Sequence, residues 1–275
     1  MSDRIFIDLG KVQETLLLPL WGRAIETKKA RPRMIDRTAV EIIESIDYDF
    51  STIAGNINEV TQFAWIARSL HIDRTIRHFL KTHPNASIVN LGCGLDTTFD
   101  RVDNGSLRWF DLDLPDVIQL RKKCIAESER RRCISSSLFD DEWLEAVANE
   151  NGVFFMAAGV FYYFEEDQMK FFFKKLSTVF PGCEVIFDAA SSLGVRVANK
   201  KVIANAGMDE SSILKWGIED AKTIESWDNR IRVVEDYPLF KNMKSGLPVR
   251  NKVGTMMSDV LNIMFMVHLK FDSEQ

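Results

Sequence analysis

The spacing of hydrophobic residues divides the chain near residue 83. Before that point apolar side chains recur at helical intervals, and the clearest series is Ala39, Ile42, Ile43 and Ile46. A further helix is predicted to begin after Asn58, a favourable N-cap residue, and to end before Pro84. Residues 1–82 are therefore expected to form a helical cap that precedes a sheet.

After residue 83, short apolar runs alternate with helical patterns. Strands are predicted at residues 87–91, 107–110, 133–138, 152–158, 184–188, 231–235 and 263–269. One of the intervening helices should start at Pro115 and run to about Glu129. Strands that alternate with helices of about ten or more residues predict an α/β fold with a doubly wound, mostly parallel, Rossmann-like sheet. Residues 189–226, which include Gly207, break the alternation and are interpreted as a lid or substrate-side insertion, with a helix around Ile213, Trp216 and Ile224.

Length and charge indicate a globular domain that does not bind nucleic acid. The chain has 275 residues, enough for a single domain in which residues 1–82 are the cap and 83–275 the core. Lys and Arg number 35 against 40 Asp and Glu, and the net charge of −5 provides no basic field for nucleic acid. A small-molecule or protein substrate is therefore expected.

Other residue types bear on metals, disulfides and membranes. The four cysteines form no C-x-x-C pair, and the four histidines are not grouped with them at ligand spacing, so we expect reduced thiols and no metal site. Asp3, Arg4 and Asp8 interrupt any signal-peptide segment, and no apolar run approaches about 18 residues. The chain is thus predicted to be cytoplasmic, without a membrane span, and its sequence leaves the oligomeric state open.

The turn after the first predicted strand carries the clearest chemical signal. Gly92 and Gly94 can adopt positive φ at the carboxyl end of that strand, where open α/β sheets bind ligands. Asp111 and Asp113 follow 19 and 21 positions after Gly92, close to the offset of about 20 at which an acid meets the ribose of a dinucleotide. The spacing predicts a nucleoside site, with a purely structural turn as the alternative.

Two residues of this turn indicate which nucleoside binds. The third glycine of the dinucleotide fingerprint, which allows a pyrophosphate at the helix N-terminus, is replaced by Thr97, and Asp96 adds a negative charge. A pyrophosphate would meet that carboxylate, whereas a cationic cofactor without phosphate would not. S-adenosylmethionine is therefore favoured over NAD.

The two acids after the second predicted strand share one face. Alternate residues of a strand point the same way, so Trp109, Asp111 and Asp113 lie together. Asp113 is expected to be the main ribose ligand because Leu114-Pro115 follows it at the mouth of the sheet. In the alternative interpretation both acids are helix-cap or loop residues.

The end of the fourth predicted strand is the second candidate for chemistry. Ala158 and Gly159 close an apolar run and are followed by Tyr162 and Tyr163. We consider these tyrosines candidates for positioning a substrate, and the alternative is that they belong to an aromatic core.

Four stretches together resemble a known family. They are residues 18–24, 88–97, 109–115 and 159–164, which read LPLWGRA, IVNLGCGLDT, WFDLDLP and GVFYYF. The combination is similar to the leucine carboxyl methyltransferase family, and within it to the tetracenomycin-type polyketide O-methyltransferases. The resemblance implies a class I methyltransferase with seven strands, the last antiparallel, a helical N-terminal cap and S-adenosylmethionine over the strand ends.

The resemblance also implies roles for individual residues. Gly92 and Gly94 would pass under the cofactor, and Asp113 with Asp111 would bind the ribose. The other implied contacts are Arg68 and Arg23 with the methionine carboxylate, and Ser137 and Leu138 with adenine. The family commonly reads Ala-Glu-Gly at the end of the fourth strand, whereas this chain reads Ala157-Ala158-Gly159, so an acid on the cofactor side is missing.

The predicted function is an S-adenosylmethionine-dependent O-methyltransferase for a carboxylate or phenolic hydroxyl of a small, polyketide-like molecule. A carboxylate is already ionised at pH 7, whereas a phenol with a pKa of about 10 needs a base. No His or Lys is clearly placed as that base, which favours a carboxylate. The alternatives are a methyltransferase for protein C-terminal carboxylates and, because of Ala158, a non-catalytic binding module.

Overall fold

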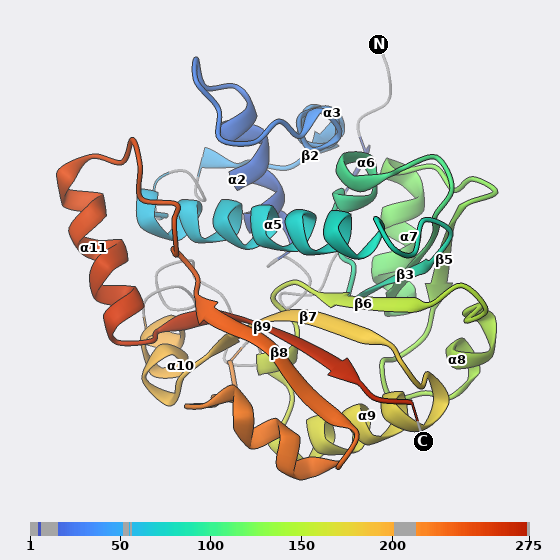
Figure 1. The fold of residues 1–275 in the computed structure, drawn as a ribbon. Helices are drawn as coiled ribbons and strands as arrows, with labels where there is room; N and C mark the ends of the chain where they lie inside the picture. The colour runs from blue at the N-terminus through green and yellow to red at the C-terminus, as the bar shows by residue number, and fades with distance from the viewer. Residues whose placement is uncertain (1–4, 7–15, 52–54, 56, 201–212, 274–275) are drawn as a thin grey trace.

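A seven-stranded sheet forms the centre of the molecule (Figure 1). The computed structural model describes residues 5–6, 16–51, 55, 57–200 and 213–273. Its strands are β3 (Ser87–Leu91), β4 (Arg108–Asp113), β5 (Arg131–Ser135), β6 (Val153–Ala157), β7 (Glu184–Ala190), β8 (Ile231–Pro238) and β9 (Met264–Phe271), in the order β5-β4-β3-β6-β7-β9-β8. Neighbouring strands from β5 to β7 are parallel, and β9 is antiparallel to both β7 and β8. The predicted α/β fold, with its antiparallel last strand, is confirmed.

Strand order reverses at β3, whose two neighbours are β4 and β6. The chain runs outward to β5 on one side and then returns to start the other half of the sheet at β6. Such a reversal leaves a crevice outside the carboxyl ends of the two central strands, which is where open α/β sheets bind ligands. The topology therefore points to the ends of β3 and β6.

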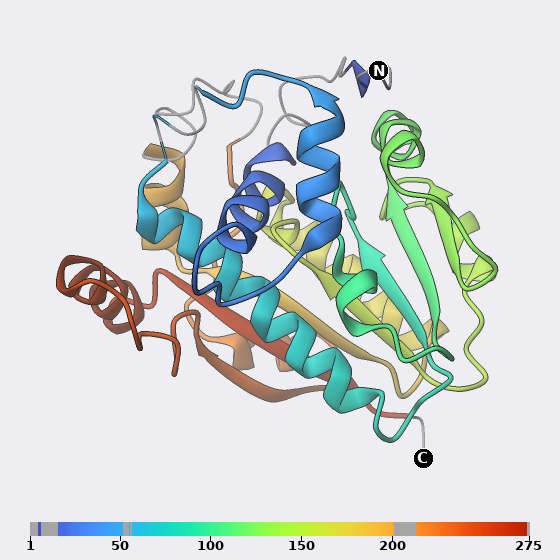
Figure 2. The ribbon, with the colours of Figure 1, turned by 90° about the horizontal axis from the view of Figure 1, so that it is seen from above.

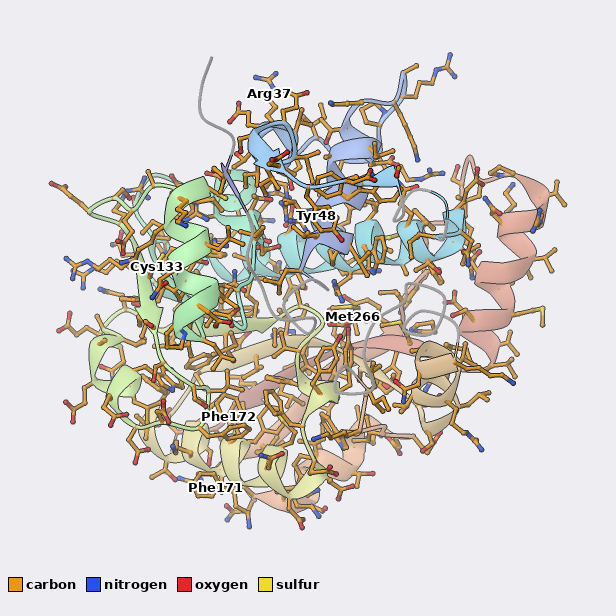
Figure 3. All side chains as sticks on the ribbon, turned by 180° about the vertical axis from the view of Figure 1, so that it is seen from behind. Arg37, Tyr48, Cys133, Phe171, Phe172 and Met266 are labelled. Atoms are coloured by element: carbon orange, nitrogen blue, oxygen red, sulfur yellow. The ribbon has the colours of Figure 1, made fainter. Side chains whose placement is uncertain are left out.

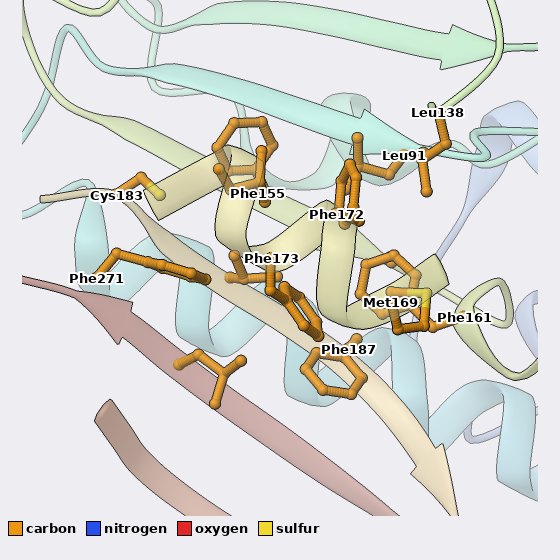
Figure 4. Close-up of a cluster of buried hydrophobic side chains, with 14 of the residues drawn as sticks. Leu91, Leu138, Phe155, Phe161, Met169, Phe172, Phe173, Cys183, Phe187 and Phe271 are labelled. Carbon is orange, nitrogen blue, oxygen red and sulfur yellow. The ribbon is translucent and has the colours of Figure 1, made fainter. Parts of the chain in front are cut away.

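Both faces of the central strands are buried, which explains their continuous apolar sequences. Phe154 and Met156 of β6 belong to one cluster, together with residues of α5 (Glu59–Phe79). Phe155 and Ala157 belong to a second cluster on the opposite face, beneath α9 (Glu166–Val179) (Figure 4). Within α9, Phe172 and Phe173 are fully buried.

Around the sheet lie short helices, whose bounds are α6 (Thr98–Val102), α7 (Pro115–Cys124), α8 (Glu142–Ala146), the 3-10 turns η1 (Phe161–Tyr163) and η4 (Ala221–Trp227), α10 (Ser192–Ala198) and α11 (Val249–Val260). Figure 3 shows Phe171 at the surface of α9 and Phe172 beneath it. No strong sequence signal marked α11.

For three of the predicted elements whose bounds differ in the structure, hydrogen bonds give the reason. α7 stops at Cys124 instead of about Glu129, because a tight turn closed by the Ser128 N–H and the Arg131 carbonyl (2.9 Å) leads directly into β5. The third predicted strand ends at Ser135, since the Ser137 N–H donates to the Asp140 carboxylate (2.8 Å) in a turn.

The third difference is the helix predicted around residues 213–224, which is wrong over its first half. Residues 213–219 form no helix, because the Trp216 N–H donates to the Tyr162 carbonyl (3.1 Å) and the Ile218 N–H to the Ala190 carbonyl (2.8 Å). Only η4 follows. Residues 201–212 of the proposed insertion, Gly207 among them, lie outside the described residues.

The N-terminal cap comprises α2 (Leu17–Thr27), α3 (Arg37–Ser45), α5 and a short parallel pair, β1 (Ile5–Phe6) with β2 (Ile46–Asp47), which the sequence did not suggest. Asn58 caps α5 as predicted, accepting the Thr61 N–H at 2.9 Å. Seen from above, α2 and α3 lie side by side across α5 (Figure 2).

A buried carboxylate joins this cap to the core. Asp36 accepts hydrogen bonds from Arg23 Nε (2.9 Å) in the cap, and from Thr97 Oγ1 (2.5 Å) and Arg101 Nη1 (2.7 Å) in the core. Arg101 also forms a bidentate pair with Asp73 of α5 (2.9 and 3.0 Å). The cap is therefore anchored on the segment that directly follows β3.

Candidate functional site

The turn after β3 requires glycine at two positions. Gly92 and Gly94 have φ of 61° and 45°, values that L side chains adopt only with strain. A Cβ at Gly92 would also lie 2.7 Å from a methyl group of Val160, and one at Gly94 would lie 2.9 Å from a methyl group of Leu16. The backbone of this turn is thus closely packed at the carboxyl end of β3.

Asp113 lies beside this turn, at the end of β4. Its carboxylate accepts hydrogen bonds from the backbone N–H of Gly94 (2.7 Å) and of Leu114 (2.8 Å). Burial raises the pKa of Asp113, and these two N–H groups offset the effect only in part. The side chain is half-buried, so its remaining lone pairs can accept further hydrogen bonds.

Asp111, one pleat deeper, has a different environment. Its fully buried carboxylate pairs with Arg121 Nη2 (2.7 Å) and Arg131 Nε (3.0 Å), and it accepts hydrogen bonds from Asn90 Nδ2 (3.1 Å) and Trp109 Nε1 (2.8 Å). The indole contact agrees with the expectation that Trp109 and Asp111 share a face. Because four protein donors surround this carboxylate, its evident role is to hold the strands and α7 together.

Arg121 of α7 connects Asp111 to the glycine turn. Its fully buried guanidinium donates to the carbonyl oxygens of Gly94 (2.7 Å) and Asp96 (2.8 Å). Gly94 is therefore held at its N–H by Asp113 and at its C=O by Arg121. Sequence reasoning missed this residue, although Arg121 follows Val117 by four residues on the buried side of α7, which was an available signal.

Arg23 contacts Leu95 and Asp96, the two residues that follow Gly94 in the turn. Besides its bond to Asp36, its guanidinium donates to the Leu95 carbonyl (3.2 Å) and lies 3.8 Å from the Asp96 carboxylate. Burial raises the pKa of Asp96, but Arg23 and Arg101 outweigh burial and hold it at about 2. Asp96 is therefore ionised at neutral pH, and the Arg23 side chain is occupied by protein partners.

A second group of polar side chains meets at the ends of β6 and β7. Arg68 of α5 donates through Nη1 to Asp188 Oδ2 (2.9 Å) and to Tyr162 Oη (3.4 Å), while Asp188 Oδ1 accepts the Gly159 N–H (2.7 Å). Burial lowers the pKa of Arg68, but Asp188 and Tyr162 together outweigh burial and raise it. Arg68 Nε is buried and has no hydrogen-bond partner within the described part of the chain.

The side chains of Arg68 and Tyr162 can lie this close to the backbone because residue 159 is glycine. It has a φ of 80°, and a Cβ at this position would lie 2.6 Å from Arg68 Nη1 and 3.0 Å from Tyr162 Oη. Asp188 was missed as a site residue, although an acid that closes an apolar strand is the signal that identified Asp111 and Asp113. We refer to Gly92, Gly94, Asp113, Arg68, Gly159, Tyr162 and Asp188 as the strand-end site.

Comparison with known proteins identifies the chain. Residues 17–177 match the model of the leucine carboxyl methyltransferase family. The protein belongs to this family. It is 30% identical to the tetracenomycin polyketide synthesis O-methyltransferase TcmP of Streptomyces glaucescens, over 94% of this chain and 95% of that one. The resemblance found in the sequence is confirmed, and the protein is a methyltransferase.

One further relative and one solved structure are similar to this chain. The S-adenosyl-L-methionine-dependent methyltransferase dpfgK of Gibberella zeae is 25% identical, over 86% of this chain and 89% of the relative. The solved structure of an S-adenosylmethionine-dependent methyltransferase from Anabaena variabilis superposes with a TM-score of 0.52 at 11% identity, covering 98% and 99% of the two chains. The latter likeness concerns the fold alone.

Other residues predicted for the site have different surroundings in this member of the leucine carboxyl methyltransferase family. Tyr162 is buried and Tyr163 partly buried, with ring centroids 5.2 Å apart. Ala158 is partly buried and packs against the cluster beneath α5. Ser137 lies in the turn after β5, and the Leu138 side chain is part of the core (Figure 4). The Leu138 side chain is therefore occupied by packing contacts.

The described residues hold no group of three or more side chains that could bind a metal ion, and none of their helices is long and apolar enough to cross a membrane. All four cysteines are free thiols.

Proposed function

We propose that this methyltransferase uses S-adenosylmethionine to methylate a carboxylate of a small, polyketide-like molecule. The observation that carries the proposal is the strand-end site itself, in which Asp113 has acceptor capacity left beside the glycine turn and Arg68 has a free donor beside Gly159. The relative dpfgK, an S-adenosyl-L-methionine-dependent methyltransferase, supports the cofactor. The relative TcmP, a polyketide O-methyltransferase, supports a polyketide-like acceptor, and the carboxyl group in the family's name supports a carboxylate.

The residues of the site fit the cofactor's functional groups. Arg68 Nε, which has no partner among the described residues, suits the carboxylate of the methionine moiety. Asp113 suits the ribose diol, because a carboxylate accepts both hydroxyl hydrogen bonds. Gly92 and Gly94 let the cofactor approach the backbone, and the loop at Ser137 and Leu138 receives the adenine. When bound, S-adenosylmethionine supplies a methyl group activated by its sulfonium.

The ionised Asp96 supports a cofactor without phosphate. With a pKa of about 2, its carboxylate is negative throughout the physiological range, so the helix terminus after the turn does not favour a pyrophosphate. Asp111 and Arg23, which were predicted to touch the cofactor, are proposed instead to support it, Asp111 through Arg121 and Arg23 through the carbonyl of Leu95.

A carboxylate acceptor is supported by where the histidines lie. His268 pairs with Glu184 at the start of β7, His78 and His83 precede β3, and His71 is buried against the Leu239 carbonyl. None of these contacts places an imidazole beside the strand-end site to deprotonate a phenol. Methyl transfer to a carboxylate needs orientation more than base catalysis, and Tyr162 and Tyr163 are proposed to position the acceptor.

The acceptor class is tested with radioactive methyl donor. The purified protein is incubated with aromatic polyketide acids and with matched phenols that lack the carboxyl group, and release of S-adenosylhomocysteine is measured. We expect label in the acids only, as a methyl ester that mild alkali cleaves, whereas an aryl ether would survive. Alkali-stable label, label found only in added lysate protein, or tight NAD binding without a response to S-adenosylmethionine would each overturn the proposal.

A further inference from the structure

The large apolar side chains of helix α11 face solvent, whereas a surface helix of a monomer usually turns its apolar side towards the core. Six side chains of α11 and the residue after it are exposed by half or more: Val249 (78%), Val253 (52%), Met256 (54%), Met257 (58%), Val260 (81%) and Leu261 (50%). Five of these, all except Val249, line a shallow hollow of about 420 Å³ that is entirely apolar. We call these six residues the α11 stripe.

The opposite face of α11 is small or polar, and it is this face that packs on the protein. Thr255 is fully buried, a Cβ at Gly254 would lie 3.4 Å from a methyl group of Val60 in α5, and Asn251 donates to Glu59 at the start of α5. α11 also stands at the edge of the molecule (Figures 1 and 2). An amphipathic helix normally buries its apolar face, so the α11 stripe is a surface for a partner.

The spacing within the stripe fits another helix. Val249, Val253, Met256 and Val260 follow one another at intervals of four, three and four residues, the seam of two helices packed side by side. A second copy of this chain carries the same seam, and a two-fold axis makes one patch complementary to itself. We propose that two copies of this protein associate through α11.

Charge decides the orientation of the pair. Arg250 and Lys252 flank the seam on opposite sides and are both exposed, so parallel helices would place Arg250 of one copy beside Lys252 of the other. Antiparallel helices keep these cations apart. They also bring Val249 against Val260 of the second copy, and Val253 against Met256 of the second copy. Each apolar layer of the seam is then filled.

The area of the stripe sets the strength of the association. A large aliphatic side chain carries roughly 100 Å² of apolar surface, so six that are about 60% exposed leave roughly 350–400 Å² on each copy. The stripes of two copies then bury roughly 700–800 Å² between them, and the side chains that flank the seam, such as Arg250 and Lys252, bring the total towards about 1,000 Å², the lower limit for a specific interface. The dimer is therefore reversible and depends on protein concentration.

Sedimentation velocity of the full chain between about 1 and 500 µM tests the proposal at concentrations suited to a small interface. The mass should rise from 31.5 kDa towards twice that value. Val253→Lys and Met256→Glu should each weaken association at least tenfold, whereas Phe171→Glu, at a 57% exposed residue of α9, should leave it unchanged.

Mixing the two stripe variants tests the register. Antiparallel pairing sets Lys at position 253 against Glu at position 256 of the other copy, so a heterodimer should form at concentrations where each variant alone is monomeric. Circular dichroism confirms that each variant is folded. A wild-type protein that stays monomeric, association that survives both substitutions, or a mixture that fails to pair would overturn the proposal, and a monomer that binds anionic lipid vesicles would make the stripe a membrane surface.

Discussion

Asp113→Asn and Asp111→Asn form a pair of substitutions that separates a ligand-binding acid from a supporting one. Both residues lie on β4 and point the same way, yet Asp113 has backbone N–H partners while Asp111 pairs with two arginines. Each substitution removes one negative charge and keeps the shape of the side chain. We expect Asp113→Asn to weaken cofactor binding with only a small loss of stability, because the amide oxygen can still accept one of the two backbone N–H bonds, and Asp111→Asn to destabilise the protein far more.

The magnitudes follow from the two environments. A hydrogen bond to a charged acceptor contributes about 1.5–3 kcal/mol, so Asp113→Asn should weaken S-adenosylmethionine binding by roughly ten- to a hundred-fold. Because burial raises the pKa of Asp113, its charge disfavours the folded state at neutral pH, and losing that charge offsets part of the cost of the backbone N–H bond that the amide no longer accepts. Asp111→Asn leaves the buried Arg121 guanidinium without its paired carboxylate and leaves Arg131 with Asp100 alone, at 3.4 Å, which costs about 3–5 kcal/mol.

Isothermal calorimetry gives the affinity, and urea denaturation at pH 7 gives the free energy of unfolding. Adenosine should lose affinity for the Asp113→Asn protein by the same factor as S-adenosylmethionine, since both ligands carry the ribose that Asp113 is proposed to bind. Unchanged affinity in a folded Asp113→Asn protein would refute the assignment. So would a loss of stability equal to that of Asp111→Asn, because it would show that both acids are structural.

Three other substitutions test neighbouring parts of the structure. Gly159→Ala should lower cofactor affinity at least tenfold in calorimetry, because its φ of 80° is strained for alanine and its Cβ would lie 2.6 Å from Arg68 Nη1; unchanged affinity would contradict this geometry. Tyr162→Phe removes only a 3.4 Å contact with Arg68, worth less than about 1 kcal/mol, so cofactor affinity should change little while the KM for the acceptor rises. Burial lowers the pKa of His71 to about 4, so acid should lower the free energy of unfolding by roughly 1.4 kcal/mol per pH unit between about pH 6.5 and pH 4. His71→Gln, which can still donate to the Leu239 carbonyl, should flatten that slope in urea titrations.

The fold could be predicted because its signals are local. Each central strand is a continuous apolar run, and the turns between elements carry Gly, Pro or Asn at positions that their conformation requires, as at Gly92, Asn58 and Pro115. The predicted bounds of an element were wrong where hydrogen bonds to a segment distant in the sequence compete with the local preference for helix or strand. The segment before η4 is held by the carbonyls of Tyr162 and Ala190, which no helical pattern around Trp216 could reveal.

The sequence predicted those parts of the candidate site that lie in loops and at strand ends, but not the contacts between its buried side chains. Gly92, Gly94 and Asp113 follow from short spacing, but the partners of Asp111 come from β3, β5 and α7, and Arg68 meets Asp188 across 120 positions of the chain. A charged residue on the apolar face of a helix indicates that it has a buried partner, but the sequence does not show which residue that partner is. The division between binding and supporting acids therefore required the structure.

These supporting contacts also explain how the glycine turn is kept ready for a ligand. The N–H and C=O of Gly94 are each bonded within the protein, to Asp113 and to Arg121, so the turn loses little freedom when a cofactor binds, and less binding energy is spent on ordering it. Thr97, three residues on, is bonded to Asp36 of the cap. A movement of the cap that broke this bond would therefore also disturb the segment that directly follows the turn.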